Sequence, residues 1–245
     1  MGIYDRDYIR SSPRGGFGSF SMMTVTTWLI IINVAVFLLD QMLGGNQFHV
    51  GPLTALGCFA MPEAVQGLQF WRFITFQFLH ANISHIFFNM LSLYFFGPMM
   101  EAYLGPRRYL AYYLICGIAG GVSFMLLTYL GIIEGGFLVG ASAGIFGILI
   151  GAARVAPDAR VMLMFPPIPM SLKTMAWVFV AIAAYTVFTS GYNAGGEAAH
   201  LGGAVVGFLL IRNERLLDFV YLRRPRMSFG GRRAQYKDWS KDYDR

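Results

Sequence analysis

The chain has 245 residues, of which 56% are hydrophobic and 13% charged, and its formal net charge is +6. Soluble domains carry about 25% charged residues, so this composition excludes an ordinary soluble enzyme and indicates an integral membrane protein. A chain of this length holds about five to seven membrane spans with short loops and has no room for a large soluble domain.

Six apolar segments, taken in chain order, are predicted to span the membrane as helices. They cover residues 25–43, 78–100, 109–133, 137–153, 174–190 and 198–211. A loop of about 34 residues joins the first two and is partly amphipathic, so we expect it to lie in the membrane interface. The apolar stretch 161–170 contains three prolines, which argue against a further span. The sequence therefore predicts an all-α polytopic membrane protein with six transmembrane helices.

This pattern divides the chain into three regions. We expect a polar cytoplasmic segment over residues 1–24, a six-helix membrane domain over residues 25–218 and a basic cytoplasmic tail over residues 219–245. The polar start does not resemble a cleavable signal peptide. If both termini are cytoplasmic, Arg72 is the one residue of the 19 Lys and Arg that lies outside, and the positive-inside rule favours that orientation. We expect a multi-pass protein of a bacterial inner membrane, in contact with the lipid bilayer and with no nucleic-acid partner.

Residues 140–144 read GASAG, the pattern G-x-S-x-G that is associated with a nucleophilic serine, here Ser142. In soluble α/β-hydrolases this pattern lies on a sharp turn between a strand and a helix. Here an apolar run of helical length follows Ser142, and no alternation of strands and helices surrounds it, which argues against that fold. Small residues also line closely packed membrane helices, so helix packing is an alternative explanation of the pattern.

Ionisable and polar residues within membrane spans are costly and therefore indicate function. The chain contains four histidines: His49, His80, His85 and His200. Three of them lie at or in predicted spans, and Asn89 follows His85 by four residues, on the same helical face. In the predicted orientation four residues lie near the outer ends of their helices: His85, Asn89, Ser142 and His200.

The depth of Ser142 and His200 follows from the arginines after them. Arg154 and Arg212 each lie 12 residues downstream, which is about 18 Å along an α-helix. If both arginines mark the inner edge of a hydrocarbon core about 30 Å thick, the serine and the histidine lie on the order of 10 Å below the outer surface. A nucleophile and a base are thus predicted at one depth inside the membrane.

Glycines recur every three or four residues along the fourth and sixth predicted spans. They are Gly140, Gly144, Gly147 and Gly151 on the fourth, and Gly203 and Gly207 on the sixth. Such stripes let two helix backbones approach closely, which would bring Nε2 of His200 within hydrogen-bond distance of Oγ of Ser142. Close packing without catalysis is compatible with the same stripes.

Together these motifs resemble the rhomboid family of intramembrane serine proteases over most of residues 71–207. The matching elements are Trp71-Arg72, His80-x4-His85-x3-Asn89, Glu101, Gly140-x-Ser142, and Ala199-His200 followed by Gly203 and Gly207. The resemblance implies a six-helix rhomboid-like bundle with a water-filled cavity open to the outside. It also implies that Ser142 is the nucleophile and His200 the general base of a two-residue dyad. His85 and Asn89 are then implied to stabilise the oxyanion.

The resemblance further implies an endopeptidase that cuts the locally unwound transmembrane segment of a single-span or other membrane-protein substrate, with no cofactor or metal. Arg72 and Glu101 look structural in the family. Phe146 resembles an aromatic position that packs against the histidine ring, and an ordinary core or lipid-facing aromatic is the alternative. Ala143 departs from the family pattern, in which Gly often follows the serine, and this puts the local oxyanion geometry in question.

Several alternatives stay open at this point. Glu197 could orient His200 as a third catalytic member, but a loop carboxylate is more often solvated, so we expect a dyad. The histidines lack the H-E-x-x-H spacing of a metal-dependent hydrolase. A Ser-Lys pair is excluded because Lys173, the one lysine before the tail, lies on the cytoplasmic side. A transporter, or a non-catalytic rhomboid-like protein that binds membrane helices, is the non-enzyme alternative; intact Ser142 and His200 argue against the latter.

Overall fold

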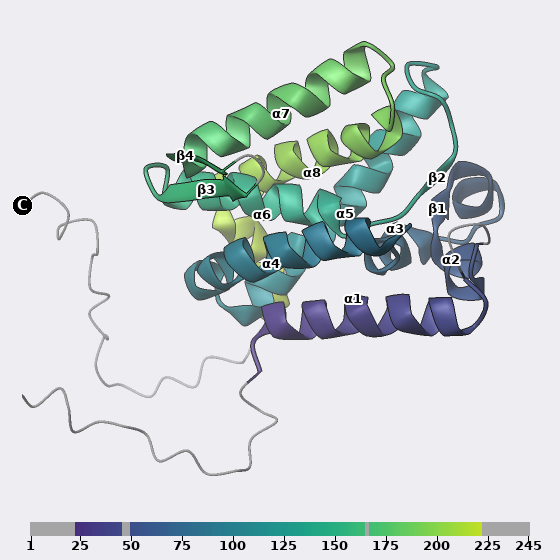
Figure 1. Ribbon diagram of the computed structural model, residues 1–245, viewed down its shortest axis with the longest axis horizontal. Coiled ribbons are helices and arrows are strands. Elements are labelled where there is room, and N and C mark those ends of the chain that lie inside the picture. Colours follow the sequence, from purple (N-terminus) through teal and green to yellow (C-terminus); the bar gives the residue numbers. More distant parts are fainter. Residues whose placement is uncertain (1–22, 46–49, 165–166, 222–245) are drawn as a thin grey trace, which may run out of the picture.

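The computed structural model describes residues 23–45, 50–164 and 167–221. His49, most of the expected segment 1–24 and most of the expected tail 219–245 lie outside these ranges. The described residues are mostly helical (Figure 1). The longer helices are α1 (Val25–Met42), α4 (Ile83–Leu104), α5 (Pro106–Tyr129), α6 (Ser142–Val155), α7 (Leu172–Phe188) and α8 (Ala194–Arg212).

Six helices correspond to the six expected spans. By length and composition, α1, α4, α5 and α8 can cross a membrane, and α6 and α7 are shorter apolar helices. The short elements are α2 (Pro52–Gly57), α3 (Arg72–Thr75), the turns η3 (Pro62–Gln66), η4 (Phe76–Phe78) and η5 (Glu214–Val220), and the strands β1 (Phe59–Ala60), β2 (Phe137–Leu138), β3 (Arg160–Met164) and β4 (Pro167–Ser171). The prediction of an all-helical bundle of six apolar segments is confirmed, with two short antiparallel strand pairs added.

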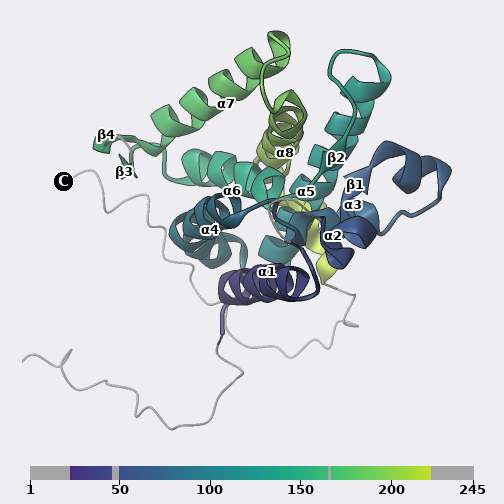
Figure 2. The ribbon, with the colours of Figure 1, turned by 45° about the vertical axis from the view of Figure 1, so that its right-hand side comes forward.

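The shortest of the six helices, α6, lies at the centre of the bundle. It contacts α4, α5, α7 and α8, while α1 packs on the outer side of α4 (Figures 1 and 2). Small residues make this central position possible, because most of the glycines and alanines of α6 are buried. Around it, Tyr109, Tyr112 and Tyr113 of α5 are fully buried and fill the core. A helix enclosed on four sides is a rigid support for the serine at its first position.

Helix α4 begins at Ile83, five residues later than the sequence predicts. Residues 76–78 form the separate turn η4, and Leu79 is extended, with φ −105° and ψ 148°. Asn82 then caps α4, because its side-chain oxygen accepts a hydrogen bond from the backbone N–H of His85 at 2.8 Å. The expected start at residue 78 is therefore wrong for a local reason, a polar cap inside an apolar stretch.

Helix α6 also begins later than expected, at Ser142 and not at residue 137. Phe137 and Leu138 form strand β2, which pairs antiparallel with Ala60 and Phe59 of β1. The chain then reaches α6 through Gly140, whose φ is +130° and whose N–H donates to the carbonyl oxygen of Phe76 at 2.9 Å. The serine thus stands at the N-terminus of its helix, at the end of a loop that is tied to the first long connection.

That first connection, between α1 and α4, is folded against the bundle. Arg72 is only 5% exposed, and its guanidinium donates to the carbonyl oxygens of Cys58 at 2.6 Å and Ala55 at 3.0 Å. It also donates to Oε1 of Gln69 at 2.7 Å. Within the same connection, Nε1 of Trp71 donates a hydrogen bond to a backbone carbonyl oxygen. The contacts of Arg72 are structural, as expected.

Glu101, near the end of α4, holds the start of α1. Its carboxylate accepts hydrogen bonds from the backbone N–H groups of Val25 and Thr26 at 2.7 and 2.8 Å, and from the Thr26 hydroxyl at 2.7 Å. A carboxylate at a helix N-terminus satisfies orphan donors and complements the helix dipole. The contacts of Glu101 are structural too.

The loop before α7 and the turn after α8 complete the fold. Residues 160–164 and 167–171 form the antiparallel strands β3 and β4, which agrees with the expectation that the prolines prevent a span there. After α8, η5 returns to the bundle, where Leu217 is fully buried and Asp218 pairs with Arg108. Ordered packing therefore continues slightly beyond residue 218.

Candidate active site

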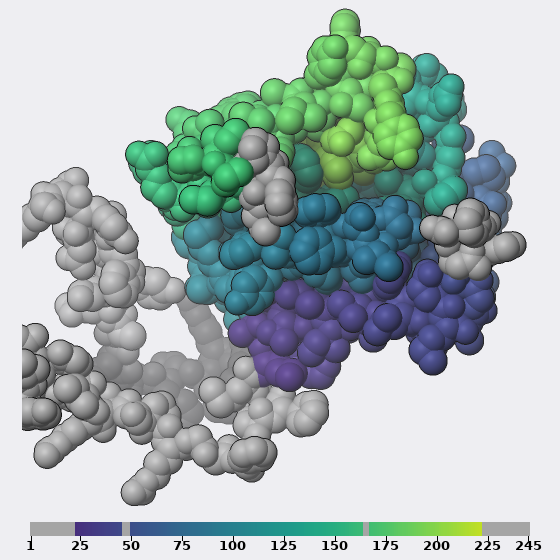
Figure 3. Space-filling view, viewed as in Figure 1, coloured from purple at the N-terminus to yellow at the C-terminus, as the bar shows by residue number. Residues whose placement is uncertain are grey.

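A cavity of about 900 Å³ opens between α4, α6, α7 and α8. In the space-filling view the surface is recessed between α4 and α7, and atoms of α8 are visible in the recess (Figure 3). The four predicted site residues, Ser142, His200, His85 and Asn89, all line this cavity. The structure thus brings together residues that come from three different helices.

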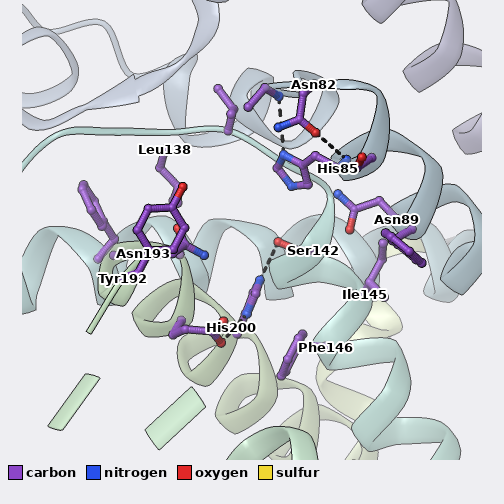
Figure 4. A pocket seen from close by; sticks show the side chains of 18 of the residues that line it. Asn82, His85, Asn89, Leu138, Ser142, Ile145, Phe146, Tyr192, Asn193 and His200 are labelled. Atoms are coloured by element: carbon purple, nitrogen blue, oxygen red, sulfur yellow. Dashed lines mark hydrogen bonds and ion pairs between the residues drawn. The ribbon is translucent and has the colours of Figure 1, made fainter. Parts of the chain in front are cut away.

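The central contact joins Ser142 and His200. Oγ of Ser142 lies 2.7 Å from Nε2 of His200 (Figure 4), a distance at which the hydroxyl donates to an unprotonated ring nitrogen. Ser142 is the first residue of α6, and His200 lies in the second turn of α8. From these positions α6 continues to Arg154 and α8 to Arg212 without a break. The equal helical rise assumed from the sequence therefore holds.

The other ring nitrogen of His200 has a partner that the sequence did not favour. Nδ1 of His200 lies 2.8 Å from Oε2 of Glu197, three residues earlier on α8. The expectation that Glu197 stays solvated is wrong, because its side chain is only 20% exposed. The spacing of three residues, which places both side chains on one helical face, was the signal for this contact.

The helix seam that brings Ser142 to His200 depends on glycine. A Cβ added at Gly203 of α8 would clash with the carbonyl oxygen of Ala143, and one at Gly207 would lie 2.7 Å from Cα of Gly147. The hydroxyl of Tyr112 lies 2.7 and 2.9 Å from the carbonyl oxygens of Gly147 and Gly207, so it bridges the two helices. The predicted close approach of α6 and α8 is confirmed at these positions.

Two glycines of the predicted stripe serve a different neighbour. A Cβ at Gly144 would lie 2.7 Å from the ring of Tyr113, and one at Gly151 would lie 2.6 Å from Cε of Met100 on α4 and 2.8 Å from the hydroxyl of Tyr112. Both tyrosines belong to α5. The hypothesis that Gly144 sets the distance between α6 and α8 is therefore wrong, since this glycine makes room for α5.

Gly140 keeps the space beside Ser142 open. A Cβ at this position would lie 2.7 Å from Nε2 of His85 and 3.5 Å from Oγ of Ser142. With φ at +130°, the backbone adopts a conformation that favours glycine. A glycine is thus favoured at the first position of the G-x-S-x-G pattern for both a conformational and a steric reason. Its bare Cα separates the serine from the His85 ring.

His85 and Asn89 both carry donors at this point of the cavity. Nδ1 of His85 lies 3.4 Å from the backbone nitrogen of Ala81; this N–H donates to Nδ1, which leaves Nε2 protonated in the neutral ring. Nδ2 of Asn89 is buried and has no hydrogen-bond partner among the described residues. An unpaired buried donor is costly, so an acceptor that arrives with a ligand would gain from it. These groups are suited to stabilise negative charge beside Ser142.

Ala143 does not intrude on this space. It is buried, and its Cβ points at α5, where a Cβ added to Gly120 would clash with it. Its carbonyl oxygen faces Gly203. The departure from the family pattern therefore falls on the side of α6 that packs against other helices, away from the cavity.

Phe146 fixes the plane of the His200 ring. The two rings are stacked, with centroids 4.2 Å apart and planes inclined by 9°. Phe146 lies one turn after Ser142 on α6, so the same helix positions the serine and supports the histidine. The expected contact with the histidine ring is confirmed.

His80 lies behind the site. It is 4% exposed, and its ring centroid is 5.1 Å from that of His85. Neither of its ring nitrogens has a hydrogen-bond partner within the part of the chain that the structure describes. His80 supports the back of the His85 ring but is not among the residues that line the cavity.

A comparison with family models identifies a rhomboid domain over residues 67–213, more than half of the chain. The chain belongs to the rhomboid family. With its apolar helices, this makes it an integral membrane protein.

Curated rhomboid relatives are similar over most of the chain. Rhomboid protease GluP of Bacillus subtilis is 30% identical over 187 residues, which cover 76% of this chain and 34% of the relative. RHOMBOID-like protein 1 of Arabidopsis thaliana is 30% identical over 181 residues, 74% of this chain and 42% of the relative. Rhomboid protease AarA of Providencia stuartii is 27% identical over 217 residues, 82% of this chain and 75% of the relative. The chain thus spans less than half of the first two relatives.

Proposed function

We propose that this rhomboid is an intramembrane serine endopeptidase that cleaves transmembrane segments of membrane proteins. The observation that carries the proposal is the 2.7 Å contact between Oγ of Ser142 and Nε2 of His200 in a cavity of about 900 Å³. That two of the three similar rhomboids are named proteases supports it. We propose no cofactor and no metal.

In the proposed reaction Ser142 attacks the carbonyl carbon of the scissile peptide bond. His200 accepts the serine proton at Nε2 and later donates it to the leaving amine. Water, which loses a proton to the same nitrogen, attacks the resulting acyl-enzyme, and His200 returns that proton to Oγ of Ser142 as the acyl–oxygen bond breaks. Stacking on Phe146 keeps the imidazole in one plane during both steps. Nε2 can therefore accept a proton and donate it from the same position.

We propose that the oxyanion of each tetrahedral intermediate lies beside Gly140. Nε2–H of His85 and the amide of Asn89 are the donors, and the N-terminus of α6 at Ser142 adds backbone N–H groups without intrahelical partners. The lack of a partner on Nδ2 of Asn89 supports this role. A donor that is already in place requires no rearrangement when charge develops.

We also propose that both termini are cytoplasmic and that the cavity opens to the outer side. The distribution of Lys and Arg supports this orientation, as do Arg154 and Arg212 in the last turns of α6 and α8. The membrane domain then covers residues 25–218, between a cytoplasmic segment and a basic tail, in a bacterial inner membrane. A substrate helix would enter from the bilayer and present its cleaved bond below the outer surface.

The proposal is tested with the purified chain in liposomes. The chain is incubated with a panel of single-span membrane proteins, and the products are identified by mass spectrometry. In parallel, a serine-reactive phosphonate is added and the labelled residue is mapped. We expect internal cleavage within or near a transmembrane segment, and labelling at Ser142.

Two variants make the result specific. Ser142→Ala should lose both cleavage and labelling. Ser92→Ala is the matched control, because Ser92 also lines the cavity but its hydroxyl donates to the backbone carbonyl oxygen of Phe88 at 2.8 Å; it should still be labelled. A parent chain that binds membrane helices without cleaving any of them, and without labelling, would support the non-catalytic alternative.

A further inference from the structure

We propose that Glu197 is a positioning residue for His200, so that this rhomboid uses a Ser-His-Glu relay in place of a two-residue dyad. This inference rests on the proposed function. Its basis is the 2.8 Å contact between Oε2 of Glu197 and Nδ1 of His200, made on the opposite edge of the ring from Ser142. Serine, imidazole and carboxylate therefore form one continuous line of hydrogen bonds.

The start of α8 presents Glu197 to His200. The chain enters α8 through Asn193, which has a left-handed φ of 63°, and the N–H of Glu197 donates to the carbonyl oxygen of Asn193 at 3.1 Å. Glu197 thus lies in the first turn, where the helix dipole favours a negative charge. His200 follows one turn later on the same face, so no long-range rearrangement is needed to join the two side chains.

The surroundings favour a carboxylate that acts on His200 alone. The side chains of His200 and Glu197 are 14% and 20% exposed, so water competes little for the contact. Apolar side chains lie near this turn: a Cβ added at Gly195 would meet Phe124 of α5, and Phe179 and Ile182 of α7 line the same cavity. The other ionisable side chains that line the cavity are His85, Glu134 and Tyr192.

The carboxylate would act at two points of the reaction. Before attack, it accepts the hydrogen of Nδ1, which fixes the tautomer in which Nε2 is free to accept the serine proton. When that proton arrives, the ring becomes a cation, and the negative charge beside Nδ1 stabilises it. No proton needs to move to Glu197, and no other reactant is required.

The test measures kcat and KM for the parent chain, Glu197→Gln and Glu197→Asp, all shown to keep a cooperative thermal transition. Gln removes the charge, so kcat should fall about a hundredfold while KM changes little. Asp keeps the charge, so its kcat should lie well above that of Gln.

Glu134→Gln is the matched control. Glu134 lines the same cavity but is exposed and is not bonded to His200, so solvent screens its charge and kcat should stay at the parent value. A purely structural Glu197 would lower folding stability while the folded fraction keeps its kcat. Unchanged kcat in Glu197→Gln would overturn the relay while leaving the Ser142–His200 dyad intact. A parent chain inert to every substrate and to phosphonate would instead overturn the proposed function, and the relay with it.

Discussion

Ser142 and His200 are 58 positions apart in the sequence, and their side chains lie 2.7 Å apart in the structure. Each stands near the N-terminal end of its helix, and the two helices touch through backbone at Gly203 and Gly207. The contact is therefore a property of the seam between α6 and α8. Substitutions of the two residues and substitutions along the seam should therefore differ in their effects on the rate of cleavage and on stability.

Removing either member of the pair should abolish turnover. We expect Ser142→Ala and His200→Ala each to lower kcat/KM by at least about a thousandfold, and the double variant to be hardly worse, because a nucleophile and its base act as one unit. Quantitative cleavage assays on the three variants measure this. Losses that multiply in the double variant would show that the two residues act independently.

Asn89→Ala should lower kcat with little change in KM. The Asn89 amide nitrogen has no partner in the part of the chain described here, which agrees with the proposal that it donates to charge that develops in the reaction. Loss of one oxyanion donor costs about a hundredfold to a thousandfold in kcat. The thermal transition of the variant should stay near that of the parent, since no described hydrogen bond of this amide is lost. A rise in KM alone would point to a role in substrate binding.

Gly203→Leu should separate α6 from α8. A side chain here meets the carbonyl oxygen of Ala143, and overpacking of this kind costs about 1–3 kcal/mol of stability. A displacement of about 1 Å between Ser142 and His200 can cost on the order of a hundredfold in rate. Cleavage is therefore measured on protein that inserts and unfolds cooperatively.

Val205→Leu is the control for the seam. Val205 is on the same helix but 60% exposed, so added bulk there faces lipid and should change neither stability nor rate. Normal proteolysis by well-folded Gly203→Leu protein would mean that something other than the glycine seam holds the nucleophile beside its base.

Glu101→Gln should lower stability and spare the chemistry. The variant loses charge-assisted hydrogen bonds to the N-terminus of α1, each worth about 1.5–3 kcal/mol. A clear drop in the unfolding temperature in detergent is expected, with kcat unchanged for the folded fraction. Glu63→Gln, which changes an exposed acid, should leave the transition where it is. Loss of kcat in fully folded Glu101→Gln protein would contradict a purely structural role.

Much of the site was accessible from the sequence because polar groups are rare in apolar spans. Ser142, His85, Asn89 and His200 stand out against their surroundings, and the predicted orientation of the spans places them near the outer ends of their helices. Glu197 was harder to recognise, because a glutamate near a helix start is common at surfaces. Only the tertiary structure shows that its side chain is largely buried and lies against His200.

The helix boundaries and the packing partners of the glycines were harder to predict from the sequence for a different reason. The start of α6 depends on the pairing of Phe137 with Ala60, a contact between distant parts of the chain that leaves no local signal. A stripe of glycines likewise predicts close approach but not the partner. Gly144 and Gly147 both make room for α5, at Tyr113 and Cys116, and Gly147 also lies against Gly207 of α8.

The pairing of β1 with β2 also sets the size of the smallest piece of this protein that can work. The segment that recurs across the family begins at residue 67, whereas Phe59 and Ala60 of β1 lie before it. A fragment that begins at residue 67 would keep Ser142, His200, His85 and Asn89 but leave β2, the approach to Gly140 and Ser142, without its partner strand. Truncated forms of this protein should therefore retain the chain from α1 onward, because the residues that must fold together extend beyond the segment 67–213 that matches the family.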